Sequence, residues 1–369
     1  MSKRHSDMIR KFRDGELSRR QLGKYMASLG LVSVTLPLCR TAAAAEEPLF
    51  YTWSGYDAPD LFKPYVAKHG TMPRTAIMAN QEEALQKMLA GYVVDVGHPS
   101  IDDMIKWHDS GLLQPIDTSR LKNWSSVFPE LQNMAGVSFD GNVLMVPADL
   151  GNASILYRSD LYEGEESWNM LFDERYQGKI SPWRQKYNVY AAATTLGLDM
   201  FNVPDDQLRG PILDLLRKQR DLTRFYWDDP TQAEQAMASG EIVLMHAWNS
   251  SYANLTKQGV PVKYAKPKEG VWTWVSGLVR IKGGTASENA VYDLIDDWIS
   301  PETGQFLLDV YGLAHSNKDA YDLVSKDRLE GLALSDPASM LKESVFFRPL
   351  KPEDDLRYIK LWEDVQAGL

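Results

Sequence analysis

Aromatic side chains are the residues of this chain whose types and spacing point most clearly to chemistry. The 369 residues include 11 tryptophans. Trp53 and Tyr56 follow one apolar run directly, Trp248 follows another, and Trp272 and Trp274 alternate along a third. An indole face can stack on a sugar ring or hold a cation. The pattern therefore favours recognition of a small polar or cationic molecule.

Catalytic and metal-binding motifs are missing from the sequence. No two of the six histidines are spaced i, i+4, and no H-E-x-x-H, G-x-S-x-G, Walker A or G-x-G-x-x-G string occurs. The only cysteine is Cys39, which excludes disulfides and cysteine-ligated metals from the rest of the chain. We therefore expect no catalytic residue, no metal site and no cofactor.

The charge balance argues against nucleic acid as a partner. Forty basic side chains stand against fifty acidic ones, a net charge of −10. Affinity for nucleic acid comes mainly from clustered Lys and Arg on phosphates. The hydrophobic content of 44% and the charged content of 24% are ordinary for a soluble globular protein. We expect a monomer that binds a small-molecule solute.

The first 45 residues are typical of an export signal. A basic segment leads to Ser18-Arg19-Arg20 with Leu22 and Lys24, followed by an apolar run from 25 to 38 and four alanines at 42–45. The string resembles a twin-arginine signal, which a receptor reads as an address. We expect cleavage near residue 45 and a free periplasmic protein of residues 46–369.

The elements that must position the aromatic residues alternate along the mature chain. Strand–helix alternation at this spacing predicts βαβ units and a largely parallel sheet covered on both faces. In such sheets ligands bind beyond the carboxyl ends of strands. The predicted strands are 48–53, 74–78, 93–96, 154–157, 241–247, 262–265 and 271–281, and the predicted helices include 82–90, 211–219, 231–239, 289–299, 301–311 and 351–366.

From Phe50 to its end, the chain resembles the periplasmic putrescine/spermidine-type solute-binding proteins of ABC importers. Four groups of short stretches carry the resemblance. The order and spacing of these stretches match over nearly the whole mature chain, and the ordered set is more specific than any single motif. The stretches are YTWSGY (51–56) with AP (58–59), VDV (94–96) with PS (99–100) and SGLLQPID (110–117), ASGEI (238–242) leading to Trp248, and PKEG (267–270) with NK (317–318).

The resemblance implies an α/β, two-lobed, type II periplasmic-binding-protein fold. Two hinge-crossing strands, 148–157 and 268–278, would join the lobes, with the ligand in the cleft between them and hinge closure around it. Lobe one would hold 46–148 and the return segment 272–369, which carries the C-terminal helices, while lobe two would hold 149–271. The closed form would dock on an inner-membrane ABC permease.

The resemblance also implies which residues contact the ligand. Trp53, Ser54, Tyr56, Ser100 and Trp248 match ligand-contacting positions of the family, whose clefts place aromatic rings around polyamine methylenes and carboxylates at the ammonium ends. Trp274, which alternates with Trp272, joins this candidate set.

Several acids of the family pattern are replaced. Ser251 and Ser276 stand at two acidic positions, and a third falls near Lys186 with Arg184 close by. Asp149 is an extra acid on the first crossing strand. The resemblance therefore implies a retained architecture with altered amine recognition.

The substitutions also bear on the ligand's charge. Asp102 stands where an aromatic residue is frequent and, like Asp149, could anchor one ammonium. We expect linear polyamines to bind more weakly than a ligand with one amine and a neutral or anionic end, for which Arg184 is the candidate partner.

Two other functions fit the sequence. The same fold could serve a sensor or chemoreceptor, which neighbouring permease and ATPase genes would distinguish from an importer. A hydrolase using Asp149 and Asp102 is the enzymatic alternative, and the missing catalytic motifs argue against it.

Overall fold

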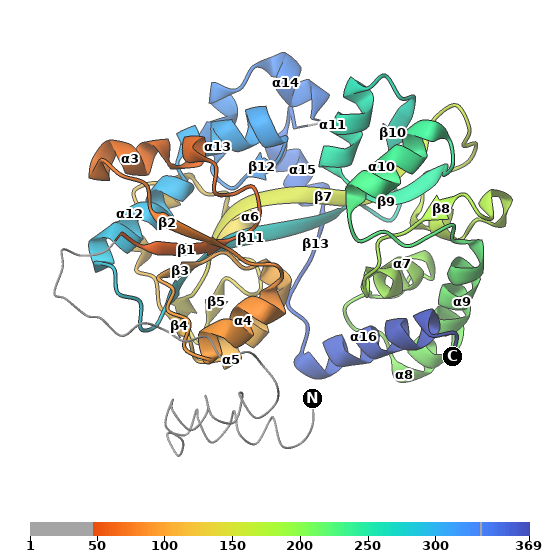
Figure 1. Cartoon of the computed structure of the whole chain (residues 1–369), viewed down its shortest axis with the longest axis horizontal. Helices are drawn as coiled ribbons and strands as arrows, with labels where there is room; N and C mark the ends of the chain where they lie inside the picture. The colour runs from red at the N-terminus through yellow and green to blue at the C-terminus, as the bar shows by residue number, and fades with distance from the viewer. Residues whose placement is uncertain (1–46, 333) are drawn as a thin grey trace. The chain divides into compact units, whose positions relative to one another are not determined.

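The computed structural model describes residues 47–332 and 334–369, which divide into two compact units (Figure 1). Unit 1 combines helices with a mainly parallel group of strands, and unit 2 combines helices with a mixed one. The predicted α/β class is therefore confirmed. Unit 1 comprises the described residues up to Ala148 together with Ser276–Phe306 and Ser316–Leu323, and unit 2 comprises Asp149–Val275, Leu307–His315 and Val324–Leu369.

The sheet of unit 1 is built around β1. Strand β1 pairs in parallel with β2 and β3, and β11 runs antiparallel to β3. Tyr51 lies opposite Gly97 in the β1–β3 register. The three parallel strands therefore end at one edge. The strands of this sheet are β1 (Leu49–Thr52), β2 (Arg74–Ile77), β3 (Val96–Gly97), β4 (Leu113–Gln114) and the part of β11 (Trp272–Ile281) from Ser276 onward. Strands β5 (Ser138–Phe139) and β6 (Asn142–Val143) form a separate two-stranded antiparallel sheet.

Helices lie on both sides of the strands of unit 1, with α3 and α12 on one side and α4 and α5 on the other (Figure 1). Phe50 of β1 contacts the rings of Phe62 and Trp298, with ring centroids 6.2 and 4.8 Å away, and all three rings are buried. This packing joins the sheet to its helices. The helices are α3 (Lys63–His69), α4 (Gln81–Leu89), α5 (Met104–Asp109), α6 (Pro129–Gln132), α12 (Glu288–Trp298) and α13 (Pro301–Phe306), with short 3-10 turns between them.

The sheet of unit 2 is mixed. Strand β7 runs antiparallel to β9, and β9 is parallel to β8. Ala153 of β7 lies opposite Trp248, so the carboxyl end of β9 meets an inner part of β7. The strands are β7 (Val146–Arg158) from Asp149 onward, β8 (Ile180–Ser181), β9 (Leu244–Trp248), β10 (Val262–Tyr264), β12 (Ala314–His315), β13 (Val345–Phe346) and β11 up to Val275.

A hydrophobic core beneath β9 holds unit 2 together. Leu156, Met245 and Trp227 are buried in it with Met237 and Leu255 from two helices. The helices of unit 2 are α7 (Tyr187–Thr195), α8 (Asp205–Gln207), α9 (Leu213–Leu222), α10 (Pro230–Ser239), α11 (Asn249–Lys257), α14 (Lys326–Gly331), α15 (Pro337–Glu343) and α16 (Pro352–Gln366), with π-helical turns at Leu208–Ile212 and Leu307–Tyr311.

Local sequence signals explain where several helices begin and end. The side chain of Asn80 accepts a hydrogen bond from the backbone N–H of Glu83 at the start of α4, and Asp229 caps α10 in the same manner. Gly70 and Gly240 end α3 and α10 in the left-handed conformation, with φ of 74° and 77°. Glycine adopts this conformation without a Cβ penalty.

The two predicted crossing strands are present. Strands β7 and β11 are each continuous and contribute residues to both units. Strand β7 extends the predicted segment 148–157 at both ends, whereas β11, at Trp272–Ile281, begins and ends a few residues later than the predicted segment 268–278. Trp274 lies in the unit 2 part of β11 and Ser276 in its unit 1 part.

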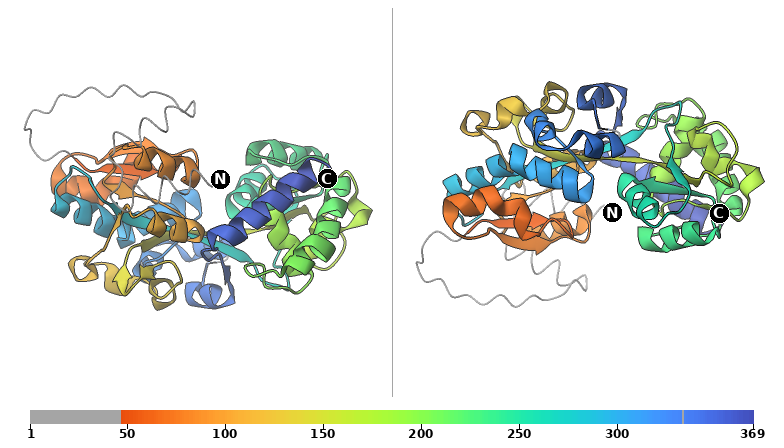
Figure 2. Two further views of the ribbon diagram at one scale, coloured as in Figure 1. Left: turned by 90° about the horizontal axis from the view of Figure 1, so that it is seen from below. Right: turned by 90° about the horizontal axis from the view of Figure 1, so that it is seen from above.

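The C-terminal segment differs from our expectation. The sequence places residues 272–369 in lobe one, whereas Val324–Leu369 packs with unit 2. Helix α16 lies against α9 and α7, as Figure 2 also shows. The buried hydroxyl of Tyr358 accepts a hydrogen bond from the backbone N–H of Val203 at 2.9 Å. The packing of α16 and this hydrogen bond both join residues that are far apart in the chain, so a local sequence pattern does not indicate them.

No helix within the described part of the chain combines the length and the apolar character needed to cross a bilayer. The predicted export signal at residues 1–45 lies outside the described residues.

Candidate functional site

The first group of predicted ligand contacts forms a tight turn after β1. The backbone N–H of Tyr56 donates to the carbonyl of Trp53 at 3.1 Å, and Gly55 has φ of 89°. A positive φ at the third residue is the type II turn geometry that requires glycine. Ser54 is exposed, while Trp53 and Tyr56 are half-buried. The turn therefore presents a serine between two aromatic rings.

His98 supports this turn from below. Its Nδ1 lies 2.9 Å from the Thr52 hydroxyl, and its ring meets Tyr56 edge to face at 5.1 Å. Both His98 and Thr52 are buried. A buried histidine with these contacts fixes the orientation of Tyr56. We infer a structural role for His98.

Ser100 and Ser276 lie opposite each other at the same edge of unit 1. They form an isolated antiparallel bridge, and the backbone N–H of Gly277 donates to the carbonyl of Pro99. Ser276 is buried and Ser100 half-buried. The backbone N–H of His98 donates to Tyr51, which ties this bridge to the end of β1.

These contacts bring five predicted residues to one edge of unit 1. We call this set the unit 1 site: Trp53, Ser54, Tyr56, Ser100 and Ser276.

The second group centres on Trp248 at the end of β9. Trp183 lies two residues beyond the parallel strand β8, and its ring meets Trp248 edge to face with centroids 4.8 Å apart. Tyr187 stacks on Trp183, also with centroids 4.8 Å apart and an interplanar angle of 9°. All three rings are half-buried. We call Trp183, Tyr187 and Trp248 the aromatic wall. Part of each of these side chains is exposed to solvent.

Three polar atoms beside this wall are buried without a hydrogen-bond partner among the described residues. They are Nε2 of His246, Oδ1 of Asn249 and Oγ of Ser251. Asn249 and Ser251 occupy the first turn of α11, which follows Trp248 directly. Buried polar groups in native proteins are nearly always satisfied by protein, water or ligand. We call Trp183, Trp248, His246, Asn249 and Ser251 the unit 2 site.

His246 is held neutral. Its ring lies within 6.1 Å of four indoles, those of Trp168, Trp183, Trp248 and Trp272. Burial disfavours the charged imidazolium and lowers the pKa of His246 to about 3. The imidazole therefore adds hydrogen-bonding capacity to the unit 2 site without adding charge.

The basic residues of the third predicted position are already engaged. Arg184 is exposed, and its Nε lies 3.0 Å from Asp228 Oδ2. Its Nη2 donates a hydrogen bond to the carbonyl of Tyr226. Lys186 pairs with Asp355 of α16 in a buried contact. Arg184, the predicted partner for the neutral or anionic end of the ligand, would therefore have to exchange Asp228 for the ligand.

Trp274 and Asp149 lie on the long strands β11 and β7, in their unit 2 parts. Both residues are more than 20 positions away in the chain from the residues of the aromatic wall. The indole of Trp274 covers Gly151, where an added Cβ would lie 2.4 Å from the ring. Asp149 is completely buried and lies opposite His315 in the β7–β12 register. Trp274 thus depends on the glycine beneath it for its position.

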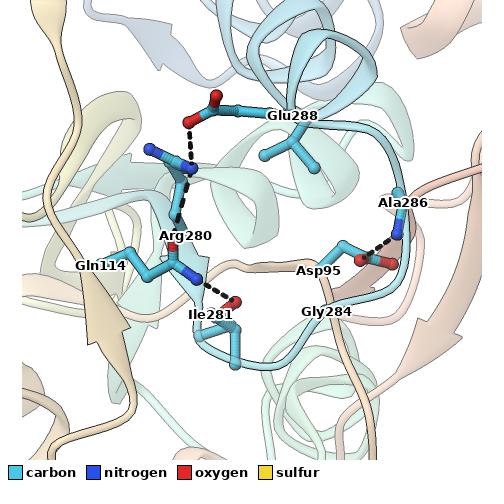
Figure 3. A pocket seen from close by; sticks show the side chains of 8 residues that line it. Asp95, Gln114, Arg280, Ile281, Gly284, Ala286 and Glu288 are labelled. Atoms are coloured by element: carbon cyan, nitrogen blue, oxygen red, sulfur yellow. Dashed lines mark hydrogen bonds and ion pairs between the residues drawn. The ribbon is translucent and has the colours of Figure 1, made fainter.

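A pocket of about 300 Å³ in unit 1 lies at the opposite edge, near the start of β1 (Figure 3). Asp95 in this pocket accepts hydrogen bonds from the backbone N–H groups of Leu49 and Ala286. Arg280 donates to Glu288 at 2.7 Å and to Gln114 at 3.2 Å. Because these groups satisfy one another, we interpret the pocket as structural.

Within residues 47–332 and 334–369, no group of three or more His, Cys, Asp or Glu is placed to hold a metal ion.

The sequence analysis missed three residues of the unit 2 site: His246, Asn249 and Trp183. Trp183 follows a strand end, the same signal that singled out Trp53 and Trp248. The strand before it, Ile180–Ser181, has only two residues. A two-residue strand leaves no periodic pattern to detect.

The comparison with protein families decides the identity. Residues 62–332 match the family model described as bacterial extracellular solute-binding protein. The chain belongs to this family. It is a family of solute-binding proteins and not of enzymes, in line with the sequence motifs.

Individual relatives support the same assignment. The solute-binding protein is 25% identical over 349 residues to the putrescine-binding periplasmic protein PotF of Escherichia coli K12, covering 89% of this chain and 94% of that protein. It is 22% identical to the spermidine/putrescine-binding periplasmic protein of the same organism, over 92% of this chain and 97% of that one.

Solved structures show the same fold. PotD of Streptococcus pneumoniae, described as the substrate-binding protein of a spermidine/putrescine ABC transporter, superposes with a TM-score of 0.75 at 19% identity, over 88% of this chain and 99% of PotD. A spermidine/putrescine ABC transporter protein of Listeria monocytogenes gives 0.73 at 20% identity, over 87% and 99%. The predicted type II periplasmic-binding fold is confirmed.

Proposed function

We propose that this protein is the substrate-binding component of an ABC importer. It captures a small amine-containing solute outside the cytoplasmic membrane and delivers it to an inner-membrane permease. The observation that carries the proposal is the pair of aromatic sites, one at the carboxyl edge of each unit, in a chain of the extracellular solute-binding family. Units 1 and 2 correspond to the two lobes, and the protein works as a monomer.

An amine in the solute is supported by two lines of argument. The named relatives bind putrescine or spermidine. Both sites offer half-buried indole faces, Trp53 in unit 1 and Trp183 with Trp248 in unit 2, and such faces attract an ammonium group or pack on the methylenes of an amine.

Mass spectrometry of the solute that co-purifies with the protein tests the proposal. We expect a single small molecule at one equivalent per chain, with at least one amine nitrogen. The Trp53→Ala variant should retain less of it, because lost stacking and apolar burial cost about 1–3 kcal/mol of binding. A co-purified molecule without nitrogen, or equal retention by the variant, would contradict the proposal.

Export through the twin-arginine route is part of the same proposal. The Arg19→Lys, Arg20→Lys double variant should leave full-length protein in the cytoplasm, because the receptor reads the arginine pair. Immunoblots of cytoplasmic and periplasmic fractions measure this, with Lys24→Arg as a charge-preserving control. Normal processing of the double variant would refute the twin-arginine assignment without affecting the binding function.

A further inference from the structure

The unit 2 site holds three buried polar atoms that the described chain leaves without hydrogen bonds. Ser251 is 0% exposed and His246 2% exposed, and neither Ser251 Oγ nor His246 Nε2 has a partner in this part of the structure. Oδ1 of Asn249 is also buried without a hydrogen-bond partner in this part of the structure, although Nδ2 of Asn249 donates to the carbonyl of Gly312 at 2.6 Å. A desolvated polar group without a partner costs about 1–3 kcal/mol.

The residues that carry these atoms are neighbours along the chain. His246 and Trp248 are two residues apart on β9, so their side chains lie on the same face of the sheet. Asn249 and Ser251 follow in the first turn of α11, whose N-cap residue, Trp248, provides no side-chain cap. Ring contacts of 6.1 and 4.8 Å connect Trp183 to His246 and Trp248. Ring contacts thus join Trp183, His246 and Trp248, and Asn249 and Ser251 adjoin this cluster along the chain.

The chemistry of the group is uncharged. Serine donates and accepts, the asparagine oxygen accepts, and a neutral imidazole nitrogen does one or the other according to its tautomer. None of the five side chains of the group is charged, and Arg184, which follows Trp183 in the chain, is paired with Asp228 at 3.0 Å. An ammonium taken out of water costs several kcal/mol unless a carboxylate lies beside it. This group is therefore better matched to a hydroxyl than to an ammonium.

We infer that the unit 2 site recognises a hydroxylated, uncharged part of the solute. The substrate class would be an amine that carries a polyol-like chain in place of a second ammonium. The hydroxyls would exchange hydrogen bonds with Ser251, Asn249 and His246, and the carbon chain would pack on Trp183 and Trp248. The inference rests on the proposed function and defines the substrate class for it.

Three matched probes test the inference by calorimetric titration of the purified full-length mature protein. Glucamine (1-amino-1-deoxysorbitol), 1-aminohexane and 1,6-diaminohexane share a six-carbon chain and one ammonium. They differ in having hydroxyls, only hydrogens, or a second ammonium on the rest of the chain. We expect glucamine to bind at least about 10-fold more tightly than the other two, the effect of one to two good hydrogen bonds.

Variants of Ser251 assign the effect to the unit 2 site. Ser251→Ala should weaken glucamine binding about 3- to 10-fold and leave 1-aminohexane unchanged. Ser251→Asp should shift the preference toward 1,6-diaminohexane, because it adds a carboxylate. Ser159→Ala serves as the matched control, since Ser159 is an exposed serine of unit 2 that donates to the carbonyl of Pro261.

The outcomes separate this inference from the proposed function. Tighter binding of 1,6-diaminohexane than of glucamine overturns the inference and leaves an amine importer in place. Glucamine binding that Ser251→Ala does not weaken also overturns it. If none of the three probes binds and no amine co-purifies, both the inference and the proposed function fail.

Discussion

Replacing Asp355 by alanine is expected to lower the free energy of unfolding by about 3–5 kcal/mol. Asp355 forms an ion pair with Lys186, and the two side chains are 3% and 12% exposed. Removing the carboxylate leaves a lysine ammonium buried without its counter-charge. The loss of a buried partner costs more than the intact pair contributes, because desolvation of the remaining charge is uncompensated.

The positions of the two residues strengthen this expectation. Lys186 is the N-cap residue of α7, where the helix dipole disfavours a positive charge. Asp355 lies in the first turn of α16, where the dipole favours a negative charge. The carboxylate is therefore stabilised in two ways, whereas the ammonium depends on the carboxylate.

Urea unfolding followed by circular dichroism measures the effect. Asp205→Ala is the matched control, because Asp205 pairs with Arg357, which lies in α16 as Asp355 does. Asp205 is 66% exposed, and exposed ion pairs contribute about 0–1 kcal/mol. The double variant Lys186→Met, Asp355→Leu should regain most of the lost stability, since an apolar pair fills the site without charge. A loss under about 1 kcal/mol in Asp355→Ala would contradict the expectation.

Local sequence signals predicted β1, β9 and β11, which position the two sites, but not β8, α7 and α11 of unit 2. The apolar run 271–281 corresponds to β11 at Trp272–Ile281, and the amphipathic segment 351–366 to α16 at Pro352–Gln366. The helix at 231–239 ends at Gly240 as predicted. Periodicity and glycine stops are properties of neighbouring residues, which is why a single sequence contains them.

Long-range partners could not be predicted. Lys186 and Asp355 are 169 residues apart in the chain, and neither residue type distinguishes a buried pair from two solvated charges. For the same reason the sequence did not show that α16 packs on α9. The choice of unit for the C-terminal segment depends on contacts such as that of Tyr358 with Val203, which no local pattern encodes.

The candidate sites were predicted by position more than by chemistry. Trp53 and Trp248 follow strand ends, and the general rule for α/β sheets selects that edge. The orphaned atoms of His246 and Asn249 are different, because an unsatisfied atom is defined by everything around it. The sequence motifs assigned no role to His246 and did not single out Asn249.

The second large effect is expected for Trp227→Ala, which should lower the free energy of unfolding by about 3–5 kcal/mol. Trp227 is 1% exposed, packs in the core beneath β9, and donates its indole N–H to the carbonyl of His246 at 3.1 Å. Truncation removes the packing and leaves a buried carbonyl without that donor. Trp248 is half-buried and lies against the edge of the same core.

Trp248→Ala should therefore have the opposite profile, with a stability loss of about 1 kcal/mol and solute binding weakened about 10- to 100-fold through lost stacking and burial. Urea unfolding of the solute-free proteins measures the first quantity, and titration with the solute identified by mass spectrometry measures the second. Equal destabilisation by the two variants would place Trp248 in the core and remove it from the unit 2 site. A stable Trp227→Ala protein would instead show that the core beneath β9 tolerates a cavity, and the contrast between core and site tryptophans would fail.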